Sequence, residues 1–242
     1  MNTNSNGYTF FFAVAMVLVV AATLAFTATS LQERQYENVR LEKMQNILMT
    51  VGVETDREGA EALFNQYITQ QVSLNPDGSI DEEVNAFELD LAKELKKPIE
   101  EQHFPLYVAD IEGKNYYIIP LRGAGLWNAI WGYISLKDDI NTIKGATFDH
   151  LGETAGLGAE ITQMWFRKRF EDERIFDESG ALAGVSVIKG YKGGNAKDDN
   201  AVDAISGATI TGDGVTDMIT ERLEHYLPYF KKQPTFKVAS AY

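Results

Sequence analysis

An uninterrupted apolar segment near the N-terminus constrains this chain more than any other feature of its sequence. The run from Tyr8 to Phe26 has two threonines and one tyrosine as its only polar side chains. About 20 apolar residues in a helix, at roughly 1.5 Å per residue, cross the hydrocarbon core of a bilayer. The sequence therefore predicts a transmembrane helix over residues 8–29, preceded by a short tail at residues 1–7.

A cleaved signal peptide is the main alternative for this segment. Signal peptides begin with a positively charged stretch and have an apolar core of roughly 7–15 residues. Residues 1–7 contain no lysine or arginine, and the apolar run is longer than such a core. These two observations favour the transmembrane helix.

The charges that follow the apolar run are mixed in sign. Cations beside a membrane span tend to stay in the cytoplasm, so Arg34, Arg40 and Lys43 would hold the rest of the chain there. Three acids lie among them and weaken that indication, which leaves the orientation open from charge alone. The six residues are Glu33, Arg34, Glu37, Arg40, Glu42 and Lys43.

Composition excludes several functions. The formal net charge of −13 belongs wholly to the part of the chain after the apolar run, because no charged residue precedes Glu33. An acidic surface repels a phosphate backbone, so nucleic acid is excluded as a partner. The chain has no cysteine, which excludes disulfides and thiolate-bound iron–sulfur clusters, so redox chemistry would need an organic cofactor. The three histidines are too scattered to predict a metal site.

The segment after the apolar run predicts a stalk. Apolar residues recur at helical spacing from Leu31 to Val51, so we expect the helix to continue as an amphipathic stalk over residues 30–52. Thr55 and Glu58 have the spacing of a capping box, which predicts a short helix beginning there.

Residues 53–230 predict one α+β domain with an antiparallel sheet and flanking helices. Short aromatic-rich segments between Leu106 and His150 have the composition of strands joined by tight turns. Other expected elements are a turn at Asn75–Gly78, a helix at 161–170, a strand at 185–188, a terminal helix that stops near Pro228, and a tail at 231–242.

The first candidate site is the stretch from Asp203 to Thr211, which reads DAISGATIT. Small residues let a bulky group approach the backbone closely, and the start of the following helix offers unpaired N–H groups suited to a phosphate. Thr209 and Ser206 each offer a hydroxyl. The ordinary alternative is a strand-to-helix turn in which these side chains serve only as caps.

The second candidate is the loop from His150 to Gly158, which reads HLGETAGLG. Its three glycines permit tight turns and close contact with a flat ligand. No GxGxxG pattern completes it, which excludes Rossmann-type NAD binding. Nearby, Trp127 could line a pocket for such a ligand, or it could simply cover the hydrophobic face of the sheet.

Together the two motifs, in this order and behind one apolar span, resemble the FMN-binding domain family. That family occurs in the C subunit of Na⁺-translocating NADH:quinone reductases and in the G subunit of Rnf electron-transport complexes. The resemblance implies that a flavin transferase cuts FAD and esterifies its FMN through the phosphate to Thr209. It also implies two sets of FMN-binding residues besides Trp127: Asp203, Ser206, Gly207 and Ala208 in the attachment motif, and Glu153, Thr154, Gly156 and Leu157 against the flavin.

The segment GLWNAIWG at Gly125–Gly132, followed by KGATFDH, is more similar to the quinone-reductase protein than to the Rnf protein. Ala155 departs from the family, which commonly has proline there. The resemblance implies a six-subunit bacterial inner-membrane complex, with the flavin domain in the periplasm and the electrons passing from NADH to ubiquinone as sodium is exported. An Rnf-type subunit, a membrane-anchored binding or sensory module, and a structural protein without a cofactor remain as alternatives.

Overall fold

The computed structural model describes residues 5–194 and 196–236. Residues 1–4 of the expected N-terminal tail and residues 237–242 of the expected C-terminal tail lie outside this range. The chain divides into two compact units, Met1–Lys43 and Met44–Tyr242. Each unit is described by itself.

The first unit consists of most of helix α1, which runs over Asn6–Thr50. Its apolar stretch has a mean hydropathy of 2.5 over 18 residues, long and apolar enough to cross a membrane. Threonine hydroxyls in this stretch donate to carbonyls one turn earlier, as Thr23 does to Val19 at 2.8 Å. Such bonds satisfy polar groups where no water is present. One continuous helix thus contains the residues predicted as a span and nearly all those predicted as a stalk.

The second unit begins with the last two turns of α1, followed by helix α2, Arg57–Tyr67. The predicted start of this helix was wrong by one residue. Asp56, not Thr55, is the N-cap, and its Oδ1 accepts a hydrogen bond from the Gly59 N–H at 2.8 Å. Aspartate is at least as good a cap as threonine, and here it occupies the position that reaches the third helical N–H.

A six-stranded antiparallel sheet forms the body of this unit, in the order β2-β1-β3-β4-β5-β6. The predicted antiparallel sheet is confirmed, and the turn at Asn75–Gly78 joins its first two strands, with the Gly78 N–H donating to the Asn75 carbonyl at 2.8 Å. The strands are β1 Ile68–Leu74, β2 Ile80–Asp81, β3 Phe104–Ile111, β4 Lys114–Ala124, β5 Ala129–Leu136 and β6 Ile143–His150.

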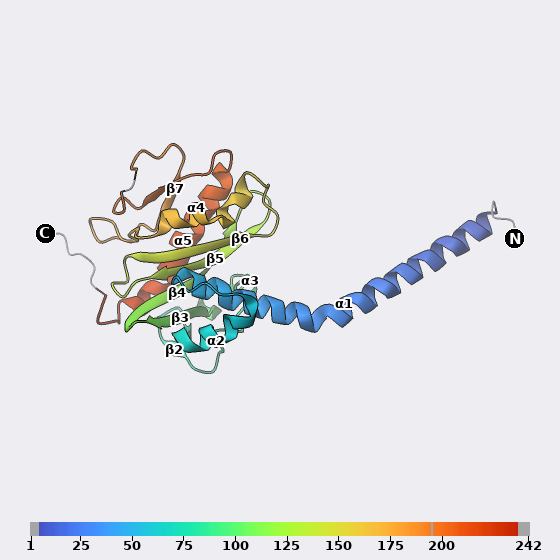
Figure 1. The fold of residues 1–242 in the computed structure, drawn as a ribbon, viewed down its shortest axis with the longest axis horizontal. Helices are drawn as coiled ribbons and strands as arrows, with labels where there is room; N and C mark the ends of the chain where they lie inside the picture. The colour runs from blue at the N-terminus through green and yellow to red at the C-terminus, as the bar shows by residue number, and fades with distance from the viewer. Residues whose placement is uncertain (1–4, 195, 237–242) are drawn as a thin grey trace. The chain divides into compact units, whose positions relative to one another are not determined.

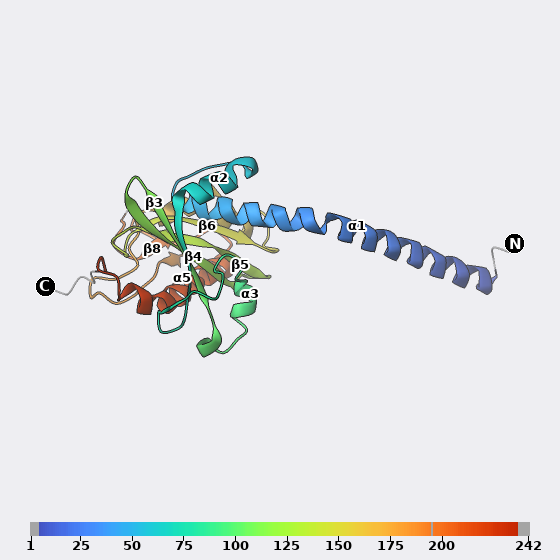
Figure 2. The ribbon, with the colours of Figure 1, turned by 90° about the horizontal axis from the view of Figure 1, so that it is seen from below.

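Both faces of the sheet are covered. Helix α5, Thr209–Phe230, lies along one face, and α2 lies on the other (Figures 1 and 2). The Tyr226 hydroxyl of α5 donates to the Pro105 carbonyl of β3 at 2.8 Å, and Phe64 of α2 packs edge-on against Tyr107 from the opposite side. Two hydrophobic layers therefore share one sheet, and α5 packs against one face of it.

Short elements connect β6 to α5. The helix expected over residues 161–170 is broken into η2 Gly158–Thr162, α4 Met164–Arg167 and η3 Lys168–Phe170. Successive turns place Phe166 and Phe170 against Phe148 of β6, with ring centroids 5.9 and 5.0 Å apart. The remaining elements are short α3 Leu91–Glu94 and η1 Ile99–Glu101, and a parallel pair of β7 Ser186–Ile188 and β8 Ala201–Asp203.

Candidate functional site

Thr209 is the first residue of the 22-residue helix α5. Its side chain is exposed, and among the described residues it makes no hydrogen bond. Ala208 precedes it as the N-cap and provides no side-chain cap. The first N–H groups of a helix lack partners within the helix and carry its positive dipole end. A hydroxyl and a helix start of the kind that suits an anion therefore lie together at one exposed position.

The loop that follows β6 packs directly against this helix start. Gly207 has a φ of +78°, which side chains rarely adopt, and a Cβ placed on it would lie only 2.7 Å from Leu157 Cδ2. The positive φ favours glycine at this position, and the absence of a side chain leaves room for Leu157. The structure brings Leu157 beside the residues just before Thr209, as a shared ligand site requires.

Glu153 joins three segments of the site. Its Oε1 accepts a hydrogen bond from the Trp127 backbone N–H at 2.9 Å, and its Oε2 accepts one from the Thr211 hydroxyl at 2.7 Å. The residue is only 7% exposed. The carboxylate therefore ties the β4–β5 connection to the first turn of α5.

The pKa of Glu153 reflects this position. Burial by itself would raise it, but hydrogen bonds from the Trp127 backbone and the Thr211 hydroxyl, with further backbone bonds from Asn128 and Leu126, bring the pKa below its ordinary value. Hydrogen bonds to a carboxylate stabilise its charged form. Glu153 is therefore ionised at neutral pH and serves as a fixed acceptor.

Glycines make room for this carboxylate. A Cβ on Gly125 would lie 2.5 Å from Glu153 Oε1, and one on Gly158 would collide with Glu153 Oε2 and the Thr211 hydroxyl. Gly125 and Gly158 thus have a packing role, which the sequence pattern alone did not reveal.

Trp127 is an exposed aromatic beside this cluster. Its side chain is 67% exposed, and its indole N–H donates to the Thr154 hydroxyl at 3.1 Å. It does not cover the sheet, so the ordinary alternative of a core tryptophan does not apply to it. A flat aromatic ring fixed at its edge and open on a face suits stacking against another flat ring.

The other residues predicted to bind FMN do not bond to Glu153 in the part of the chain that the structure describes. Asp203 ends β8, and its Oδ2 lies 3.6 Å from Arg169 Nη1, so its carboxylate pairs with that arginine. Ser206 is exposed and Ala208 is buried. Gly156, with a φ of +76°, donates its N–H to Glu160 Oε1 at 3.1 Å and so shapes the loop.

The role of Thr211 was not predicted from the sequence. Its side chain is 1% exposed, and its hydroxyl donates to Glu153, so it is not available for attachment of a flavin. Its position could have been found from helical periodicity, because Thr211 lies four residues before Val215 on the buried face of α5.

The comparisons with known proteins agree with this geometry. The sequence model of the FMN-binding domain family matches residues 125–224, which include every residue of the cluster around Thr209. Fold and site together define a protein with an FMN-binding domain behind a long apolar helix.

Relatives of known name identify the family within this class. The chain is 31% identical to the C subunit of the Na(+)-translocating NADH-quinone reductase of Pseudomonas aeruginosa PAO1, over 90% of this chain and 91% of that protein. For the C subunit of Yersinia pestis the identity is 28%, over 96% and 94%. The crystal structure of the Parabacteroides distasonis C subunit matches with a TM-score of 0.76 and 38% identity, over 84% of this chain and 98% of that one. This chain belongs to the family of C subunits of the Na(+)-translocating NADH-quinone reductases.

Proposed function

We propose that this chain carries FMN as a phosphoester on Thr209 and acts as an electron carrier within an NADH-quinone reductase. The observation that carries the proposal is the exposed Thr209 hydroxyl at the uncapped start of α5, where Leu157 lies against Gly207 and Glu153 ties the same helix turn to Trp127. In the attachment reaction, the threonine oxygen would form a bond to the FMN phosphorus of FAD. The pyrophosphate bond would break, AMP would leave, and the hydroxyl proton would pass to a base of the flavin transferase.

The residues around Thr209 fit this group. The N–H groups of the first turn of α5 would donate to the phosphate, and Trp127 and Leu157 would contact the flat ring. Glu153 would hold the Trp127 segment and the first turn of α5 at a fixed spacing, through its bonds to the Trp127 backbone and to Thr211. Bound FMN supplies reversible one-electron and two-electron redox chemistry, which the side chains of this chain lack.

The electron path is part of the same proposal. Electrons would pass from NADH through this carrier and other subunits towards ubiquinone, and the reaction would drive sodium export. The chain serves as one subunit of the assembly, so we expect no NADH:quinone reductase activity from it alone.

We also propose that the flavin domain faces the periplasm from the bacterial inner membrane. Attachment requires the domain to meet an extracytoplasmic transferase. The opposing charge signal is weak, because it rests on only three cations, Arg34, Arg40 and Lys43.

Co-expression with a flavin transferase tests the attachment. We expect the full-length band on a denaturing gel to fluoresce under ultraviolet light, because a covalent flavin survives denaturation. Thr209→Val should abolish the signal while the protein still accumulates in the membrane. Thr69→Val, the same change at an exposed position on β1, should leave it intact. A fluorescent Thr209→Val band would refute attachment at this residue.

A further inference from the structure

A second site lies where the last turn of α1 meets β6 and the short elements after it, all within the unit Met44–Tyr242. The structure has a cavity of about 160 Å³ here. Pockets for drug-sized ligands measure roughly 300–1,000 Å³, so this one suits a single small group. The residues that line it and matter for its charge are Glu54, Lys144, Arg167, Lys168 and Glu171.

The wall of the cavity is fixed by close packing. The Ser135 hydroxyl donates to the Thr50 carbonyl at 2.7 Å, which anchors the end of α1 to β5. A Cβ on Gly145 would lie 2.5 Å from that same carbonyl oxygen, so β6 can approach only because this residue is glycine. The cavity is therefore bounded by fixed backbone.

Arg167 is left without an adequate partner in this wall. Its Nε is buried and makes no hydrogen bond among the described residues, and its Nη1 donates only to the Met49 sulfur, at 2.7 Å. A thioether is a weak acceptor. Burial lowers the pKa of this guanidinium, and nearby Glu54 opposes the shift. In native proteins most buried polar groups have a partner, which can be another protein group, a water, an ion or a ligand group.

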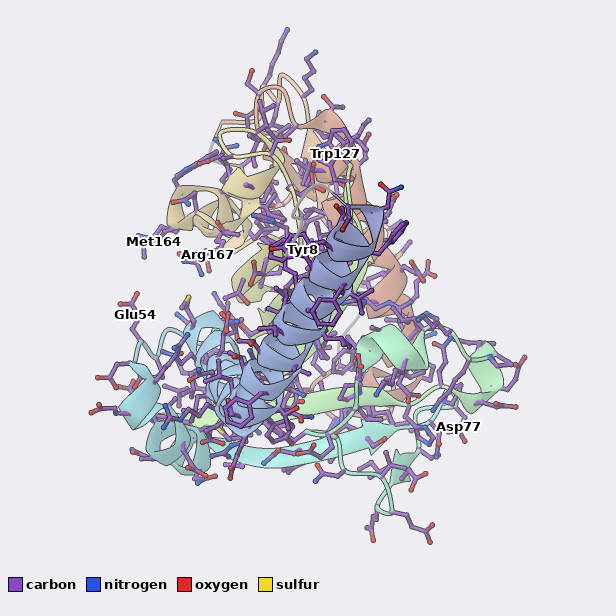
Figure 3. The ribbon with its side chains drawn as sticks, turned by 90° about the vertical axis from the view of Figure 1, so that its right-hand side faces the viewer. Tyr8, Glu54, Asp77, Trp127, Met164 and Arg167 are labelled. Carbon is purple, nitrogen blue, oxygen red and sulfur yellow. The ribbon has the colours of Figure 1, made fainter. Side chains whose placement is uncertain are left out.

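The two lysines that line the cavity also have no bonded partner among the described residues. Within the described part of the chain, neither Lys144 nor Lys168 forms a salt bridge or side-chain hydrogen bond, although the chain carries 35 acidic residues. Glu54 and Glu171 line the same cavity without pairing to any of the three cations. Met164 and Arg167 lie opposite Glu54 in Figure 3. Three positive and two negative side chains line the cavity, so cations outnumber acids in the lining by one.

We infer that this cavity binds a carboxylate group, held in two parallel hydrogen bonds by the Arg167 guanidinium and balanced by Lys144 and Lys168. Because Nε is enclosed by protein, the donors left for a ligand in the cavity are the terminal nitrogens, and the planar N–H groups of a guanidinium match the two oxygens of a carboxylate. A single negative charge neutralises the lining. The carboxylate comes either from a small organic acid or from an aspartate or glutamate of a neighbouring subunit.

Arginine-specific modification of the full-length chain in detergent tests the site. Phenylglyoxal is applied with rising sodium acetate, with sodium chloride keeping the ionic strength constant, and each arginine is followed by peptide mass spectrometry. We expect acetate to slow modification of Arg167 at least about tenfold, as a bond to a charged group warrants. Arg57, exposed at the start of α2, is the matched control and should not respond.

Variants and competing anions sharpen the test. Replacing Lys144 and Lys168 by alanine together should raise the acetate concentration needed for half protection about tenfold, as expected for lost charge-assisted contacts. Protection by chloride alone, or by phosphate at lower concentration than acetate, would overturn the assignment. Equal protection of Arg57 would do the same.

The reductase complex purified without acetate distinguishes the two sources, and this arm alone rests on the proposed function. Protection of Arg167 in the complex points to an acidic side chain of a partner. Reactivity that persists until acetate is added points to a free acid. Failure of acetate to protect Arg167 in the isolated chain and in the complex refutes the site, whatever the state of Thr209.

Discussion

Replacing Thr211 by valine removes the hydroxyl that holds Glu153 without changing the shape of the side chain. The bond is 2.7 Å long and lies in a buried setting, where Thr211 is 1% and Glu153 is 7% exposed. A hydrogen bond to a charged group contributes about 1.5–3 kcal/mol to stability. For a domain of this size, about 2–4 °C is lost per kcal/mol, so we expect the melting temperature to fall by about 3–12 °C.

The same substitution should show a characteristic pH dependence. The pKa of Glu153 is lowered in the folded protein, so its charged form contributes stability above the ordinary value of 4.5, and that contribution is lost as the pH falls through the lowered value. The cost of Thr211→Val should therefore be full at neutral pH and should shrink below pH 4.5.

Thermal unfolding of the full-length chain in detergent, followed by near-ultraviolet circular dichroism, measures both effects. Thr154→Val, which removes an exposed hydroxyl from the same site, is the matched control and should change stability by less than about 0.5 kcal/mol. A loss for Thr211→Val as small as that of the control, with no dependence on pH, would refute the role assigned to Glu153.

Three further predictions concern the close packing at two glycines and the role of Trp127. Gly158→Ala should cost about 1–3 kcal/mol, because its Cβ would collide with Glu153 and Thr211, and urea unfolding should show it. Gly145→Ala should cost a similar amount by pushing β6 from the Thr50 carbonyl, and wild-type stability would contradict the close packing there. Trp127→Ala should change stability by less than about 0.5 kcal/mol, because the side chain is 67% exposed, but should lower the fluorescence anisotropy of the attached flavin. Unchanged anisotropy would exclude stacking on Trp127.

Local patterns were enough to predict much of the fold. The long apolar run predicted the helix contained in α1, and aromatic-rich segments with tight turns predicted the antiparallel sheet. Local patterns failed where tertiary packing determines the secondary structure. Strand β1 was not predicted, because its polar residues Thr69, Gln70 and Gln71 give no clear alternation and it follows α2 without a break. The helix expected over residues 161–170 was broken into turns, because packing of Phe166 and Phe170 on β6 overrides helical periodicity.

The candidate site shows the same division. Motifs identified Thr209 and the glycine-rich loop, and glycine content indicated close backbone approach. The link through Glu153 could not be predicted, because its two partners, Trp127 and Thr211, lie 26 and 58 positions away from it in the sequence. Contacts between such distant segments follow from sheet topology, which no local pattern contains. Arg167 was missed for a similar reason, since its lack of a partner is visible only in three dimensions.

Mass spectrometry of the tryptic peptide Asp198–Arg222 tests the central proposal most directly. From protein co-expressed with the flavin transferase, this peptide should carry the mass of one FMN less one water, and fragmentation should place the added mass on Thr209. An unmodified peptide, or the added mass on any other residue, would contradict the account.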